Sequence, residues 1–196
     1  MRFFWVFFLL PCAIFAQEVA PWKVIDTITG NWNPDTHMDR AALVQTNDSN
    51  LGPMLDLVIY ANDGETLDFT EVARIRDVAW QGVAWGTHVS IIENEAGDVQ
   101  VSSGNGIADD TRWSEEVSIY YVDGAYRVTG FFNDWFDAND LEKGGGCYLD
   151  FLSGMGDITD GMGDMTPFEH SIPAQELSYW NRAEAAEECR KHLPPI

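Results

Sequence analysis

Potential metal ligands recur at alternate positions in one short segment of the chain. Counted from its start, positions 1, 3, 5, 7 and 9 are Asn31, Asn33, Asp35, His37 and Asp39. Alternate residues of a tight turn can direct their side-chain oxygens to one centre, and position 7 can add a backbone carbonyl, as in other calcium loops. The spacing therefore predicts a loop that binds Ca²⁺ through these five residues. The same residues also fit a polar turn held by Asx hydrogen bonds, without an ion.

This segment is not an EF-hand, because position 12 is Ala42 instead of a bidentate Glu and position 6 is Thr36 instead of Gly. It resembles an FG-GAP or VCBS-type repeat, from about residue 22 to residue 64. The resemblance implies an Asp/Asn-rich loop between two strands of a propeller blade, with four calcium ligands: Asn31, Asn33, Asp35 and Asp39. Only two of these are carboxylates, so we expect weak binding, with a Kd of about 10⁻⁴ to 10⁻³ M. The repeat occurs once, so a complete multi-blade propeller is not expected.

A second part of the chain, Val99 to Asp150, is similar to the second half of small exported bacterial proteins that carry one such repeat. The similarity lies in Arg112-Trp113, in the hairpin signal Asp123-Gly124 and in Gly146-Cys147. It implies a fold and export, and it implies no activity.

Two further acidic stretches could compete for a metal. One contains Asp134, Asp137, Asn139 and Asp140. The other lies in a Gly/Met-rich segment that we expect to be a loop, and it contains Asp157, Asp160 and Asp164. Neither stretch has the alternate spacing of a calcium turn. We expect both to be solvated surface acids.

A dense aromatic cluster is the main alternative site, and it consists of Phe131, Phe132, Trp135 and Phe136. Large aromatic side chains fill the core of a small β domain, which is the simpler interpretation. They can also form a platform for a sugar or a peptide, with Asp134 and Asp137 beside them. The cluster from Phe131 to Phe136 therefore supports a second hypothesis, a carbohydrate- or cell-wall-active enzyme or binding protein.

No catalytic motif accompanies these residues. The four histidines lack the HxH and HExxH spacings of zinc hydrolases, and the sequence has no Gly-x-Ser-x-Gly elbow, Walker loop or GxGxxG pattern. Acid pairs for glycoside hydrolysis stay open, because 32 acidic residues form many pairs and the sequence gives no distances. We therefore predict no catalytic residues and expect a protein that is not an enzyme.

Two cysteines follow the first 16 residues, Cys147 and Cys189. In an exported protein an even pair predicts a disulfide, and two free thiols are the alternative. The chain-entropy model makes a bridge over a loop of about 40 residues worth roughly 4 kcal/mol. This bridge would tie the C-terminal segment to the body of the protein.

The elements that position these residues are expected to be all-β, as successive antiparallel hairpins with one short C-terminal helix. Short apolar or alternating segments recur between turn residues, with the clearest hairpin signals at Glu95–Gly97 and Asp123-Gly124. This pattern is typical of a sandwich, a barrel or a propeller-like sheet. We expect the helix at about residues 181–192, with Asn181 and Glu184 as a capping box.

The N-terminal residues predict export. One positive residue precedes an apolar run from Phe3 to Leu10, and Ala16 is a small residue suited to signal-peptide cleavage. The run is too short for a membrane span, and no later segment approaches the roughly 20 apolar residues that a transmembrane helix needs. We expect a signal peptide at residues 1–16 and a single β-rich domain at 17–196, periplasmic or secreted and not membrane-integral.

Charge narrows the class of partner. The chain has 11 basic and 32 acidic residues, a formal net charge of −21. Nucleic-acid binding requires clusters of Lys and Arg, so this class is excluded. An acidic surface favours a basic partner through electrostatic steering. We expect an exported, non-enzymatic binding module for a basic protein or a glycan, and one concrete form is an inhibitor or immunity-type protein.

Overall fold

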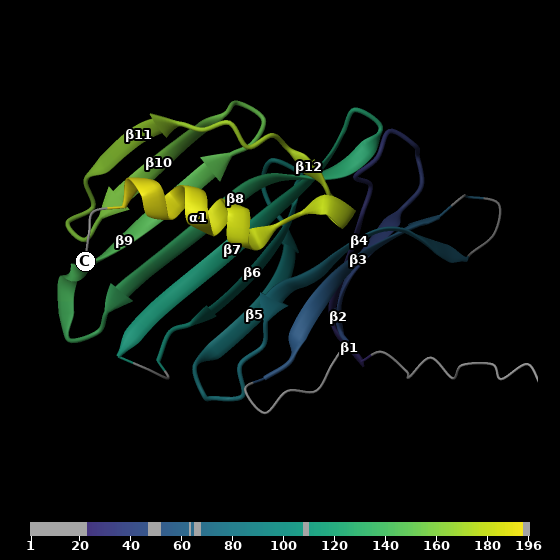
Figure 1. The fold of residues 1–196 in the computed structure, drawn as a ribbon. Coiled ribbons are helices and arrows are strands. Elements are labelled where there is room, and N and C mark those ends of the chain that lie inside the picture. Colours follow the sequence, from purple (N-terminus) through teal and green to yellow (C-terminus); the bar gives the residue numbers. More distant parts are fainter. Residues whose placement is uncertain (1–22, 47–51, 63, 65–67, 108–109, 194–196) are drawn as a thin grey trace, which may run out of the picture.

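The strands form two antiparallel sheets that do not close into a barrel (Figure 1). The computed structural model describes residues 23–46, 52–62, 64, 68–107 and 110–193, so the predicted signal peptide lies outside the described residues. The predicted all-β fold with one short C-terminal helix is confirmed. Among the described residues, no helix is long and apolar enough to cross a membrane.

The small sheet is a four-stranded meander. Its strands, in spatial order, are β1 (Lys23–Gly30), β2 (Asp39–Gln45), β3 (Met54–Asn62) and β4 (Phe69–Trp80). The two central strands carry nearly continuous apolar runs, Ala41–Val44 and Leu57–Ile59, and both runs are buried. One face joins the main core, and Ala42, Val44 and Val58 form a smaller cluster on the other face.

The large sheet contains the remaining strands. They are β5 (Thr87–Glu93), β6 (Val99–Asn105), β7 (Thr111–Val122), β8 (Ala125–Asp137), β9 (Asp140–Asp150), β10 (Met155–Asp160) and β11 (Met165–Glu169), in that spatial order, with the short β12 (Gln175–Glu176) also paired to β8. The hairpin expected at Asp123-Gly124 joins β7 to β8, and both residues have positive φ, as a type I′ turn requires. The expected loop over residues 153–164 was wrong, because the strand β10 occupies the middle half of it.

The helix α1 (Arg182–His192) lies across one face of the large sheet, beside the small sheet (Figure 1). A 3₁₀ turn, η1 (Leu177–Tyr179), precedes it. Asn181 caps α1 as predicted, since its Oδ1 accepts a hydrogen bond from the Ala183 N–H at 3.1 Å. The capping box is incomplete, because the Glu184 carboxylate accepts a hydrogen bond from Gln175 instead of from Asn181.

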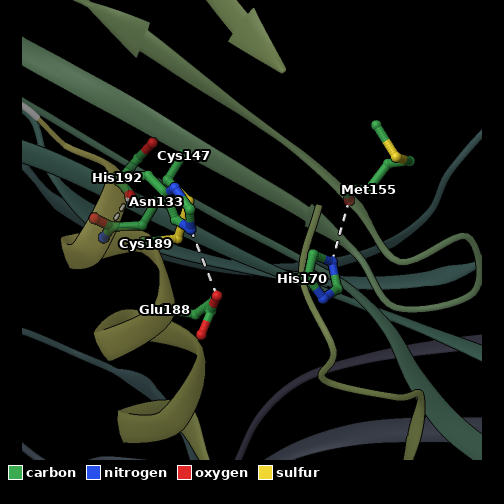
Figure 2. Close-up of a disulfide and its surroundings, with 8 residues drawn as sticks. Asn133, Cys147, Met155, His170, Glu188, Cys189 and His192 are labelled. Carbon is green, nitrogen blue, oxygen red and sulfur yellow. Dashed lines mark hydrogen bonds and ion pairs between the residues drawn. A yellow bond between two sulfur atoms is a disulfide. The ribbon is translucent and has the colours of Figure 1, made fainter. Parts of the chain in front are cut away.

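The predicted disulfide joins α1 to the large sheet. Cys147 of β9 is bonded to Cys189 of α1, with the two Cα atoms 5.7 Å apart. Figure 2 shows the bridge with Asn133 beside it, and the contact between Glu188, the residue before Cys189, and His192 one turn further along the helix. Both cysteines are buried, so the bridge fixes α1 over a continuous core that includes both sheets.

Side chains link the two sheets where their edges meet. The Asp26 carboxylate of β1 accepts a hydrogen bond from the Ile91 N–H of β5 at 3.4 Å, and Trp32 Nε1 donates to Glu93 at 2.9 Å.

At the opposite edge of the large sheet, the outer strand β11 contains Pro167.

Candidate functional site

The loop from Asn31 to Asp39 connects β1 to β2 and is held by its own side chains. The Asn33 Oδ1 accepts a hydrogen bond from the Asp35 N–H at 2.9 Å, and the Asp35 Oδ1 accepts one from the His37 N–H at 2.7 Å. The Asn31 side chain donates to the Asp35 carbonyl at 2.9 Å. These are the Asx contacts that such residues form in polar turns.

Asp39, the first residue of β2, is the buried member of the predicted ligand set. Its side chain is fully buried, and its Oδ2 accepts a hydrogen bond from the Tyr126 hydroxyl at 2.7 Å. Its Oδ1 accepts a longer one from the Asn33 side chain at 3.4 Å. Burial raises the pKa of Asp39, the Tyr126 bond lowers it, and the charge of Asp35 raises it again, with a net increase. Burial and the bond to Asp39 also raise the pKa of Tyr126.

The described residues contain no group of three or more acidic, His or Cys side chains arranged to hold a metal ion. In the predicted loop, the Asn33 and Asp35 oxygens accept backbone hydrogen bonds, and the Asp39 oxygens accept side-chain ones. These bonds, with those from Asn31 to the Asp35 carbonyl and from Asn33 to Asp39, link the five residues to one another. Calcium binding by this loop stays a prediction.

The aromatic cluster is divided between the two faces of β8. Phe131 points into the core and is 1% exposed. Trp135 lies on the same face as Phe131, because its register partner Trp113 contacts Trp80 of the small sheet. Phe132 and Phe136 alternate with it and lie on the outer face. A shallow groove of about 230 Å³ runs beside the glycine segment of β9, and its lining residues are Phe132, Asp134, Trp135, Phe136, Gly144–Gly146 and Thr159–Gly161. The core interpretation thus holds for Phe131, and a surface role stays open for Phe132 and Phe136.

The outer face of the large sheet is open, because the small sheet, η1 and α1 pack on the inner face (Figure 1). Strand register places four of its residues in one row across β7, β8, β9 and β10, and this acidic–aromatic row consists of Glu116, Phe132, Tyr148 and Asp157. Neighbouring strands are about 4.8 Å apart, so each ring lies next to the other ring and to one carboxylate. Sequence reasoning missed this row, because its members are up to 41 positions apart and only the register aligns them.

Electrostatics at Tyr148 show how acidic this face is. The side chain is 44% exposed. Burial of the remainder raises the pKa of its hydroxyl, and the negative charges of Asp150, Asp98 and Asp157 raise it further. The Asp150 carboxylate has a lowered pKa, since hydrogen bonds from Ser153 and Leu152 outweigh the effect of burial. This lowered pKa keeps the Asp150 carboxylate ionised at neutral pH.

The two arginines that strand register places on this face lie toward its ends and are occupied. Arg112 is paired with Phe136 in the register, and its Nη1 donates to the Gly106 carbonyl. Arg127 is paired with Tyr120, and its guanidinium contacts Glu176 at 3.7 Å. The centre of the outer face thus combines exposed rings with uncompensated negative charge.

Comparison with known proteins identifies no relative. No family model matches the chain, and neither the curated proteins nor the solved structures include a significant match.

Proposed function

We propose that the protein is a non-enzymatic binding module that takes a basic segment of another protein on the open face of its large sheet. The observation that carries this proposal is the acidic–aromatic row, in which Phe132 and Tyr148 lie between the carboxylates of Glu116 and Asp157. An Arg or Lys side chain over such a ring gains a cation–π interaction, and the flanking carboxylates add charge-assisted hydrogen bonds. An inhibitor or immunity-type protein for a basic partner is one form of this function.

A binding experiment with matched variants tests the proposal. The probe is a short Arg-rich peptide, compared with a Glu-rich peptide of equal length, with fluorescence anisotropy as the readout. Tyr148→Ala and Asp157→Asn should each weaken binding of the Arg-rich peptide about three- to tenfold, because each removes a contact worth about 1 kcal/mol.

The controls are Tyr179→Ala, another exposed aromatic side chain, and Asp123→Asn, an acid in the β7–β8 turn. Both should bind as the original protein does. Equal weakening by Asp123→Asn and Asp157→Asn would show that only the net charge matters. Unchanged binding by all four variants, or equal weakening by Tyr179→Ala and Tyr148→Ala, would refute the site.

We also propose that the chain is exported and that its N-terminal segment is removed. The support is the signal-like N-terminal segment together with the disulfide between Cys147 and Cys189, a bond typical of oxidising compartments. The mature protein isolated from the producing cell should begin at about Gln17 by N-terminal sequencing. A chain that retains Met1 in the cytoplasm would contradict this expectation.

Calcium binding by the Asn31–Asp39 loop is proposed as a stabilising property of the module. A ligand that binds only the folded state must raise the melting temperature. We expect a higher Tm in millimolar CaCl₂ than in chelator, and Asp35→Ala should abolish the difference. MgCl₂ at equal concentration is the control for ionic strength. An identical Tm in calcium and chelator would remove the proposal.

A glycan is the second candidate ligand, favoured by the groove over Gly144–Gly146. Aromatic walls with a few polar groups are typical of small-ligand sites, and the Asp134 carboxylate is held in place because it accepts two hydrogen bonds from Ser114. Calorimetry with soluble peptidoglycan fragments should show binding that Phe136→Ala abolishes and that Trp85→Ala, an exposed aromatic change elsewhere, leaves intact. No heat of binding to the original protein would exclude this candidate.

A further inference from the structure

Three of the chain's 11 basic residues line one cavity in an otherwise acidic protein. The cavity, of about 560 Å³, lies where the N-terminal half of α1 meets the small sheet and the inner face of the large sheet. Its charged and polar lining includes Arg76, Arg182, Arg190, Asp77, Glu115 and Asn133. We infer that this cavity binds a small oxyanion, a carboxylate or a phosphate group, through the guanidinium groups.

Arg182 is anchored with part of its guanidinium unused. Its Nε donates to the Glu115 Oε1 at 2.6 Å, and Glu115 is 4% exposed. Burial raises the pKa of Glu115, and the Arg182 contact lowers it again, with a net increase. Within the described part of the chain, no residue accepts a hydrogen bond from Arg182 Nη1 or Nη2. A planar pair of N–H donors that is held in place matches a carboxylate or phosphate.

A β-bulge in β4 brings Arg76 and Asp77 to the cavity. The register between β3 and β4 shifts opposite Asp56, and Asp77 has a positive φ of 51°. Asp56 stabilises the bulge, because its Oδ1 accepts a hydrogen bond from the Asp77 N–H at 3.1 Å and its Oδ2 contacts Arg74 at 2.9 Å. Bulges re-aim side chains and are frequent beside functional sites. A positive φ outside glycine is similarly concentrated at such sites.

The helix wall leaves room for a ligand. Ala183, Ala186 and Arg190 lie on one side of α1 at three- and four-residue spacing, so two methyl groups face the cavity beside one guanidinium. Arg190 also contacts Glu187, and Arg76 has no hydrogen bond or ion pair with another described residue. The cavity thus offers hydrogen-bond donors from the guanidinium of Arg76 and from the Nη groups of Arg182. The carboxylates of Asp77 and Glu115 repel any anion that does not bind to these donors.

Titration of ¹⁵N-labelled protein followed by NMR tests the inference. The probes are inorganic phosphate and acetate, with sodium chloride at matched ionic strength as the control. At least one probe should cause saturable shifts of the Trp180 indole, the Arg182 amide and the arginine Nε signals, and which probe saturates distinguishes phosphate from carboxylate. Shifts that do not saturate, or that chloride reproduces, would overturn the inference.

Variants distinguish anion binding in the cavity from a general effect of the protein's positive charges. Arg76→Gln alters an exposed side chain and should weaken probe binding about tenfold, the effect of losing one charged hydrogen bond. Arg182→Lys keeps the ion pair with Glu115 but loses the planar fork, and it should weaken binding as well. Arg40→Gln, an exposed arginine on β2 over the Phe69 ring, is the matched control and should not change affinity. Equal affinity in Arg76→Gln and Arg40→Gln would refute the assignment.

Discussion

Asp39 illustrates how a residue predicted from its spacing can have a contact that spacing along the chain does not reveal. The alternate spacing of the loop placed it among oxygen ligands, but its carboxylate is buried and bonded to Tyr126, 87 positions away. A buried carboxylate is costly unless hydrogen bonds satisfy it. The contact therefore links the start of β2 in the small sheet to β8 of the large sheet.

Tyr126→Phe should destabilise the protein in a pH-dependent way. Removing the donor leaves Asp39 under-satisfied and raises its pKa further, so proton binding favours the folded state more strongly. The stability that a raised pKa provides is present at acidic pH and is lost as pH rises through the carboxyl range. The deficit against the original protein should thus be small near pH 4 and about 1–3 kcal/mol at pH 7, measured by urea unfolding. Tyr121→Phe, in the neighbouring ring, should show no such trend.

At the scale of elements, predictability follows the strength of local patterns. Asp123-Gly124 and the Asn181 cap are local signals, and both were identified. β10 contains Gly156 with two acids, so it lacks the composition of a typical strand, and in β4 the bulge at Asp77 interrupts the alternation of charged and apolar residues. Predicting the acidic–aromatic row would also have required the pairing register of the strands. Bulges such as the one at Ser118/Ile119 shift that register. Neither the row nor the arginine-lined cavity could be derived from spacing along the chain.

The disulfide should control how firmly α1 docks. Replacing both Cys147 and Cys189 by Ala releases a loop with a sequence separation of 42 and should lower the free energy of unfolding by roughly 4 kcal/mol. Urea unfolding followed by circular dichroism measures the loss. The original protein in reductant should unfold at the same midpoint as the double variant. A midpoint unaffected by either change would show that packing alone holds the helix.

For the whole molecule, a net charge of −21 implies strong self-repulsion in the folded state. The few basic residues are mostly paired locally or gathered at the arginine-lined cavity, so they offset little of this repulsion. The fold therefore combines an apolar core with a surface whose charges repel one another, and added salt should weaken this repulsion.

Stability should rise with ionic strength at neutral pH. Salt at about 0.5 M screens surface charges over a few ångströms, whereas about 0.01 M leaves them interacting over roughly 30 Å. We expect a higher Tm in the first buffer than in the second at pH 7, and a much smaller difference near the isoelectric point of about 4.2. Sodium chloride and potassium chloride should act alike. A Tm that falls with salt at pH 7 would mean that attractive ion pairs dominate instead.

The outer strand β11 has a consequence for the behaviour of the protein at high concentration. An uncovered strand edge presents backbone donors and acceptors to which a strand of another molecule can pair, which is a common route to aggregation. Pro167 lies in the middle of this five-residue strand and has no backbone N–H to offer. Pro167 thus limits how far the large sheet can extend by pairing with the edge strand of a neighbouring copy.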